Sequence, residues 1–152
     1  MRLIPSIVLG SALLAGSPAE AASCPTGSLT AVVTFVRDGD TIEVGGMPIR
    51  LGGLAAPEAD EPGGDQAAAA MNELVLDREV RCDLNGERTY DRCVAVCYLD
   101  GVDIAATMVS QGLARDCERF SGGRYDAAEQ EAADGGATIR ATYSLPGYCT
   151  PR

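Results

Sequence analysis

The sequence predicts an α+β fold in which five strands form a small closed β-barrel, accompanied by three helices. Five segments are rich in β-branched residues or alternate apolar and polar positions, which is typical of strands. Three others carry apolar residues at helical spacing, with capping residues or glycines at their ends. Strands and helices do not alternate regularly, which argues against a parallel sheet built from strand–helix–strand units.

The predicted strands are short and are separated by turn signals. Gly45-Gly46 predicts a turn between the second and third strands, and Asn85-Gly86 predicts one between the fourth and fifth. In the fourth strand, Val80 and Leu84 fall on one face together with a cysteine. The five strands are expected at residues 29–37, 41–45, 47–54, 79–84 and 93–99.

Helical periodicity accounts for the remaining ordered segments. Asp65 is expected to cap a first helix that carries Ala67, Met71 and Leu74 on one face. Asp103 is expected to cap a second helix that ends before Gly112. The third helix is expected at residues 124–134, ending at Gly135-Gly136.

Length and composition restrict the classes of function. A chain of 152 residues fits one domain, and 46% hydrophobic with 22% charged residues is an ordinary globular balance. There is no His, which excludes Ser-His-Asp and Cys-His catalysis and zinc sites that need imidazole. The formal charge of −10 argues against general binding of polyanions, although a local Arg cluster remains effective because salt screens distant charges.

The N-terminus predicts a cleaved export signal over residues 1–22, followed by a single domain over residues 23–152. Arg2 supplies the positive start, residues 4–14 form a short apolar segment, and residues 19–21 (Ala-Glu-Ala) resemble a cleavage site. The apolar segment is shorter than the roughly 20 residues of a membrane-spanning helix. We therefore expect a periplasmic or secreted monomer without a membrane anchor.

Six cysteines remain after the predicted cleavage, and an even number is typical of disulfides in an oxidising compartment. Cys82 and Cys97 lie on neighbouring predicted strands and face inward, so they are the first expected pair. Six cysteines permit 15 pairings. A Cys-rich metal site is the alternative reading, but the spacing of Cys93 and Cys97 suits a strand better than a zinc knuckle.

Three polar segments interrupt this pattern, and each has a plain structural explanation when taken alone. Residues 38–41 (Asp-Gly-Asp-Thr) also read as a hairpin turn. Arg50 lies in an otherwise apolar strand that leads to Pro57-Glu58, where an Arg needs an acidic partner or an anionic ligand. Residues 88–92 (Arg-Thr-Tyr-Asp-Arg) also read as a solvated turn. Together they supply what phosphodiester hydrolysis requires: guanidinium groups for phosphate oxygens and a carboxylate that activates water.

In the order and spacing of these segments the chain resembles the staphylococcal nuclease (thermonuclease) family. The resemblance covers roughly residues 30–134 and includes residues 108–114 (Met-Val-Ser-Gln-Gly-Leu-Ala). It implies an OB-fold barrel that binds and cleaves DNA or RNA, preferably single-stranded. The roles that it implies are transition-state contacts for Arg50 and Arg92, water activation for Glu58, Ca²⁺ binding for Asp40 and the Ala56 carbonyl with Asp38 as a further candidate, and nucleotide contacts for Tyr90 and Phe120.

Two departures from the family pattern concern the predicted site. Ala55 occupies the position of a second metal-binding Asp, which weakens the expected calcium site because Ca²⁺ prefers six to eight oxygen ligands. Asp91 replaces a Gly and adds an acid next to Arg92. The segment from residue 137 onward also follows a different pattern, and we expect a Cys117–Cys149 disulfide to hold it, leaving Cys24 with Cys93.

Three functions therefore remain open. The first is an exported nuclease, which the retained Arg50, Glu58 and Arg92 favour. The second is a catalytically impaired barrel that binds nucleic acid or a protein partner, which Ala55, Asp91 and the acidic composition favour. The third, a secreted structural domain stabilised by disulfides, leaves the Arg-Glu-Arg set unexplained.

Overall fold

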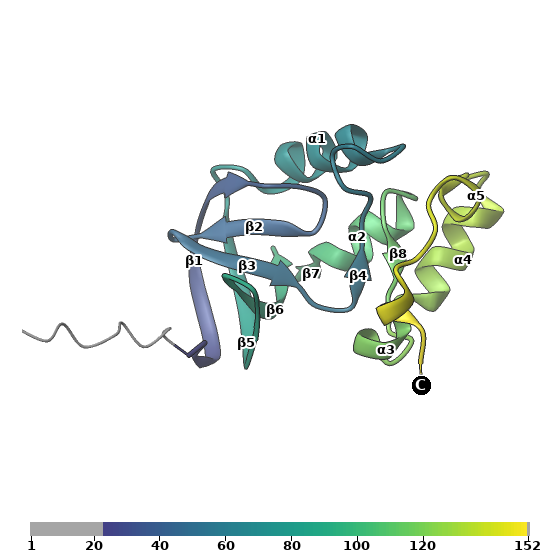
Figure 1. Ribbon diagram of the computed structural model, residues 1–152. Coiled ribbons are helices and arrows are strands. Elements are labelled where there is room, and N and C mark those ends of the chain that lie inside the picture. The colour runs from purple at the N-terminus through teal and green to yellow at the C-terminus, as the bar shows by residue number, and fades with distance from the viewer. Residues whose placement is uncertain (1–22, 152) are drawn as a thin grey trace, which may run out of the picture.

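The computed structural model describes residues 23–151, so the predicted export signal lies outside the described residues. Most strands lie in the N-terminal two thirds of this segment and most helices in the remainder (Figure 1). The strands are β1 (Thr26–Val36), β2 (Thr41–Val44), β3 (Met47–Leu51), β4 (Leu54–Ala55), β5 (Glu79–Thr89), β6 (Arg92–Leu99), β7 (Val102–Asp103) and β8 (Arg115–Asp116). The helices are α1 (Gly64–Val75), α2 (Ile104–Ser110), α3 (Glu118–Ser121), α4 (Asp126–Asp134), α5 (Ile139–Thr142) and the 3-10 turn η1 (Gly147–Cys149).

Five strands close into a barrel, which confirms the predicted α+β class. The strand order is β3-β2-β1-β5-β6, and β3 also pairs with β6 in parallel through Arg50 and Val94. This last pairing removes the free edges that an open sheet would expose. The barrel is of the OB-fold type, and the short β7 extends it beyond β6.

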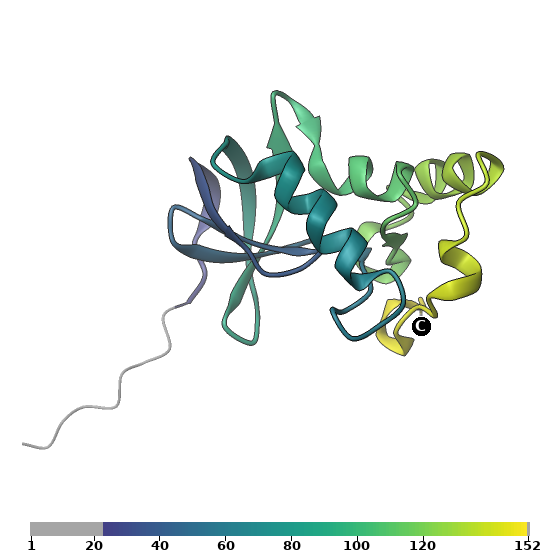
Figure 2. The same cartoon turned by 90° about the horizontal axis from the view of Figure 1, so that it is seen from above.

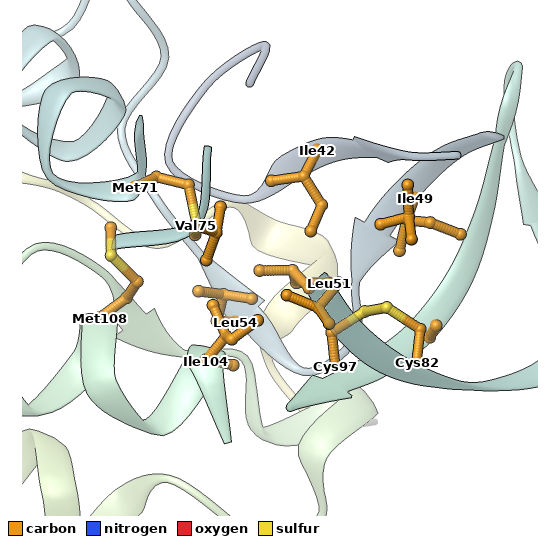
Figure 3. Close-up of a cluster of buried hydrophobic side chains, with 14 of the residues drawn as sticks. Ile42, Ile49, Leu51, Leu54, Met71, Val75, Cys82, Cys97, Ile104 and Met108 are labelled. Atoms are coloured by element: carbon orange, nitrogen blue, oxygen red, sulfur yellow. A yellow bond between two sulfur atoms is a disulfide. The ribbon is translucent and has the colours of Figure 1, made fainter. Parts of the chain in front are cut away.

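Alternation along the strands explains why this barrel forms. In β6 the residues at odd positions from Cys93 to Leu99 are buried, whereas those between them are partly exposed. Figure 3 shows the resulting core, which extends from Ile49 inside the barrel through Leu51 and Leu54 to Met71 of α1 and Met108 of α2. Burial of such side chains is the main favourable contribution to folding.

Three disulfides connect the described residues. Cys82 and Cys97 are directly opposite each other on β5 and β6, inside the barrel. The other two join Cys24 to Cys93 and Cys117 to Cys149. These are the pairs favoured from the sequence, and they are typical of proteins in an oxidising compartment.

The predicted turn at Asn85-Gly86 is wrong. Strand β5 continues to Thr89, and the chain reverses at Tyr90-Asp91 instead. Residues Asn85 and Gly86 form part of an irregularity in the pairing with β6, where Gly86 has φ +83°. Pairing of Thr26 with Asn85 extends the strand, so a contact with β1 overrides the local turn signal. The predicted strand 47–54 is likewise divided into β3 and β4.

The three predicted helices are present as α1, α2 and α4, but the structure adds the four-residue helices α3 and α5. Asp103 caps α2 as expected and accepts hydrogen bonds from Ala105 N (2.9 Å) and Ala106 N (3.2 Å). Asp65 is not the cap of α1. Gly63 is the N-cap, the helix begins at Gly64, and Asp65 lies in its first turn. The third helix begins at Asp126 rather than at residue 124.

The helices lie on two sides of the barrel. Figure 2 shows α1 running across the strands, while α4 and the C-terminal segment (residues 137–151, which include α5) lie together beyond them. The C-terminal segment runs back beside β8 and α3 (Figure 1). Among residues 23–151 the structure contains no helix that is both long enough and apolar enough to cross a membrane.

Candidate active site

The Asp-Gly-Asp-Thr turn forms a packed corner between β1 and β2. Asp38 accepts a hydrogen bond from Asp40 N (2.9 Å), which orders the turn. A Cβ atom on Gly39 would lie 2.7 Å from the Cβ atoms of both Ala56 and Ala67, so only glycine permits this approach. The packing leaves the Asp40 residue 4% exposed.

Arg50 extends from β3 to this corner and is held by several acceptors. Its guanidinium group contacts Asp40 Oδ2 (2.9 Å), donates to the Leu51 carbonyl (2.8 Å) and donates to the Leu54 carbonyl (3.1 Å). The pKa of Asp40 is raised to about 7, mainly by burial; the charge of Arg50 opposes this shift, and the charge of Asp38 adds to it. The Arg that interrupts an apolar strand therefore has the acidic partner that burial requires.

Arg92 reaches the same corner from the start of β6. Its NH1 group donates to Thr41 Oγ1 (2.9 Å), and Thr41 in turn donates to Asp40 Oδ1 (2.9 Å). Thr41 also faces Arg50 in the pairing of β2 with β3. The two arginines therefore meet at Asp40 and Thr41, although 42 positions separate them in the chain.

Glu58 lies on the loop between β4 and α1. Its N–H donates to Glu61 Oε2 (2.8 Å), and its carbonyl accepts from Glu61 N (2.9 Å). Partial burial raises the pKa of Glu58, as does the charge of Asp38, while Arg50 and Arg92 lower it. Because the charges of Asp38 and both arginines act on this carboxylate, the structure brings Arg50, Glu58 and Arg92 into one electrostatic neighbourhood.

The two predicted aromatic contacts lie in different surroundings. Tyr90 is 88% exposed in the turn between β5 and β6, with the guanidinium carbon of Arg92 5.8 Å from its ring centroid. Phe120 lies on α3, where its ring is 6.3 Å from that of Tyr148 and 5.5 Å from the Arg119 guanidinium carbon. Tyr90 is thus beside a predicted catalytic residue, whereas these contacts of Phe120 are with the C-terminal segment and its own helix.

Asp91 has an ion-pair partner other than Arg92. Its carboxylate lies 2.7 Å from Arg37 NH1, and Arg37 also contacts Glu43 (2.9 Å). The hydrogen bond from Arg37 lowers the pKa of Asp91. Arg37 was not among the predicted site residues, and it compensates the acid that replaces the family's Gly.

The residues at this corner do not fit a calcium site of the expected kind. Asp40 directs one carboxylate oxygen to Thr41 and the other to Arg50. Ala56 N is 3.5 Å from Asp40, so its backbone is adjacent, but Ala55 supplies no side-chain oxygen. Within residues 23–151 no group of three or more Asp, Glu, Cys or His residues is arranged to hold a metal ion.

Sequence reasoning missed the environment of Ala55. Ala55 is 1% exposed and packs in a cluster with Cys117, Ile139, Tyr143 and Cys149. Four of these five residues belong to α3 or the C-terminal segment, or flank them, far from Ala55 in the sequence. No local sequence signal indicated that this segment covers the position of the missing carboxylate.

Comparison with known proteins gives consistent matches. The family described as "Staphylococcal nuclease homologue" matches residues 48–138, more than half of the chain. "Succinoglycan biosynthesis protein ExoI" of Rhizobium meliloti (strain 1021) is 35% identical over 116 residues, covering 68% of this chain and 61% of that protein. An "Uncharacterized endonuclease" of Haemophilus influenzae (strain ATCC 51907 / DSM 11121 / KW20 / Rd) is 30% identical over 104 residues, covering 65% and 58% respectively.

A plant protein gives a shorter match. "Probable staphylococcal-like nuclease CAN1" of Oryza sativa subsp. japonica is 36% identical over 66 residues, which is 43% of this chain and 20% of the relative. The chain thus spans less than two thirds of the length of each of these curated relatives.

Proposed function

Because the chain belongs to the family of staphylococcal nuclease homologues, we propose that it is an exported nuclease that hydrolyses phosphodiester bonds of DNA, with RNA as a second candidate substrate. The observation that carries this proposal is that Arg50 and Arg92 contact the same neighbouring pair, Asp40 and Thr41. Export to the periplasm or the medium is supported by the three disulfides.

In the proposed reaction, Glu58 accepts a proton from a water molecule as its oxygen attacks phosphorus. Arg50 and Arg92 donate hydrogen bonds to the non-bridging phosphate oxygens, on which negative charge develops. The bond to the leaving oxygen breaks, and that oxygen takes up a proton from solvent water. Among the described residues, Thr41 accepts a hydrogen bond from Arg92 NH1, which leaves the other N–H groups of Arg92 for phosphate. The exposed ring of Tyr90 is suited to stacking on a base of single-stranded substrate.

A calcium site at Asp40 stays a prediction from the family resemblance, with the Ala56 carbonyl and Asp38 as further candidate ligands. The donors at this corner do not complete such a site, so no step of the proposed reaction depends on the metal. Calcium dependence is instead measured directly, by comparing the rate of cleavage with added calcium and with a chelator.

The test is cleavage of a labelled single-stranded DNA by the purified protein lacking residues 1–22. Glu58→Gln and Arg92→Ala should each lower kcat/KM by roughly two orders of magnitude or more, because each removes one proposed transition-state interaction. The matched controls are Glu131→Gln on the exposed face of α4 and Arg81→Ala on the outer face of β5. Equal loss in a variant and its control would contradict the assigned roles.

The second candidate is a catalytically impaired domain that binds nucleic acid or a protein partner. It is favoured by the contacts of Arg50, whose guanidinium group is already engaged by Asp40 and two backbone carbonyls. Binding of single-stranded DNA by the wild type without any cleavage, with or without calcium, would support this candidate over the nuclease.

A further inference from the structure

The C-terminal segment places a tyrosine next to the proposed active site. Tyr143 follows α5 and lies beyond the end of the family match at residue 138. Its side chain packs in the same cluster as Ala55, the position where the family pattern has a metal-binding carboxylate. Ala55 is followed directly by Ala56, whose N–H is adjacent to Asp40. The C-terminal segment therefore covers the vacant carboxylate position with an aromatic side chain.

Several contacts hold Tyr143 in this position. Its N–H donates to the Ile139 carbonyl (2.8 Å), and its carbonyl accepts from Arg115 NH1 (3.2 Å). Arg115 itself pairs with Ala55 in the β4–β8 ladder. The Cys117–Cys149 disulfide closes the segment onto α3. The Tyr143 backbone is therefore held by α5 through its N–H and by β8, which pairs with the strand of Ala55, through its carbonyl.

The hydroxyl group of Tyr143 has no acceptor or donor within the described part of the chain. The residue is only 5% exposed, and buried tyrosines usually direct the hydroxyl to a hydrogen-bond partner. Within residues 23–151, Asp116 Oδ1 is the fully buried side-chain polar atom that lacks a hydrogen-bond partner. The Tyr143 hydroxyl also lacks a partner in this part of the chain but is not fully buried, so it retains some access to solvent. A buried ring with an accessible, unpaired hydroxyl is suited to contact a ligand.

Through the cluster that it shares with Ala55, Tyr143 lies beside the proposed active site. Burial raises the pKa of Tyr143, and the charges of Glu61, Tyr148, Asp40 and Glu58 raise it further. Asp40 and Glu58 belong to the proposed active site, and Glu61 hydrogen-bonds the Glu58 backbone. The raised pKa keeps the phenol protonated, and therefore a hydrogen-bond donor, at neutral pH.

We propose that Tyr143 is a further residue of the active site, where its hydroxyl donates a hydrogen bond to a non-bridging oxygen of the phosphodiester bound by Arg50 and Arg92. This inference rests on the proposed nuclease function. A phosphate that approaches Asp40, Glu58 and Glu61 is repelled by their charges. A neutral donor attracts the phosphate oxygens and carries no charge that the nearby acids would neutralise. Its hydrogen bond strengthens as negative charge develops on the phosphate oxygens.

The test compares Tyr143→Phe, which keeps the ring, with the matched control Tyr148→Phe. Tyr148 lies in the same segment but is 53% exposed, and the substitution keeps its ring beside Phe120. We expect Tyr143→Phe to lower kcat/KM on single-stranded DNA by about 10- to 100-fold, mainly through kcat, because the lost donor acts most strongly in the transition state. The control should change by less than about twofold.

A purely structural role would give a different result. Tyr143→Phe should unfold at the wild-type denaturant concentration, since the ring and its apolar contacts are kept. If the wild type cleaves DNA and Tyr143→Phe cleaves it equally well, the role of Tyr143 is wrong while the nuclease function stands. If the wild type binds a single-stranded oligonucleotide without cleaving it, a Kd of Tyr143→Phe unchanged from the wild type overturns the proposal, and a rise of about fivefold or more supports it. If the wild type neither cleaves nor binds, both proposals fall.

Discussion

At the proposed site, the environment of each residue is set by the groups that it contacts. Arg50 interrupts an apolar strand, but its charge is not left unpaired, because Asp40 and two backbone carbonyls accept its N–H groups. Thr41 links the second arginine to the same acid. Ala55 is the contrasting case, since its side chain has no polar atom and packs in an apolar cluster with residues of the C-terminal segment.

The substitution Ala55→Asp tests whether this position still accepts the family's carboxylate. We expect it to lower the free energy of unfolding by about 2–5 kcal/mol, because the new charge would be buried among apolar side chains without a cation. The measurement is denaturant unfolding, with Ala59→Asp on the exposed loop as the control. Equal stability of the two variants would contradict the packing argument. Stabilisation by calcium of Ala55→Asp alone would show that the substitution completes a metal site.

At the scale of elements, a buried carboxylate joins the C-terminal helices to strand β8. Glu129 of α4 accepts from Arg115 Nε (2.9 Å), Asp116 N (2.7 Å) and Arg140 Nε (2.8 Å). These donors belong to β8 and α5, so one side chain connects three elements. Burial raises the pKa of Glu129, but the three hydrogen bonds outweigh this effect and lower it below its ordinary value of 4.5.

This network predicts a pH-dependent contribution to stability. A carboxylate whose pKa is lower in the folded state stabilises the protein above its unfolded-state pKa, and the contribution is lost as the pH falls through the folded-state value. Glu129→Gln should therefore reduce the free energy of unfolding by about 2–4 kcal/mol at neutral pH. The difference from wild type should shrink below pH 4.5. Unfolding curves at several pH values measure it, with exposed Glu131→Gln as the control. A difference that is constant with pH would rule out the ionised network.

For the whole molecule, charge is the property that most constrains binding. The formal charge of −10 opposes the approach of nucleic acid, so affinity must come from the few arginines at the barrel corner. The C-terminal segment restricts this corner further, because it covers Ala55 and places Tyr148 beside the predicted contact Phe120 of α3.

The salt dependence of binding checks this picture. If two arginines neutralise phosphates, the logarithm of the binding constant for single-stranded DNA should fall with log salt with a slope of about −1.4. Fluorescence anisotropy with an inactive Glu58→Gln variant measures the slope. A slope steeper than about −4 would require six or more phosphate contacts and therefore a binding surface elsewhere on the molecule.

The sequence by itself determined the α+β barrel, the Cys82–Cys97 pairing and the family, because alternation in strands and the order of short motifs are local properties. The same local signals misjudged Asn85-Gly86 and Asp65, where pairing with β1 and the packing of the preceding loop decided the outcome. Only the tertiary structure brought the segment after residue 137, including Tyr143, onto Ala55. Contacts between residues almost 90 positions apart leave no periodic trace in a sequence, since they depend on how separate elements close around one core.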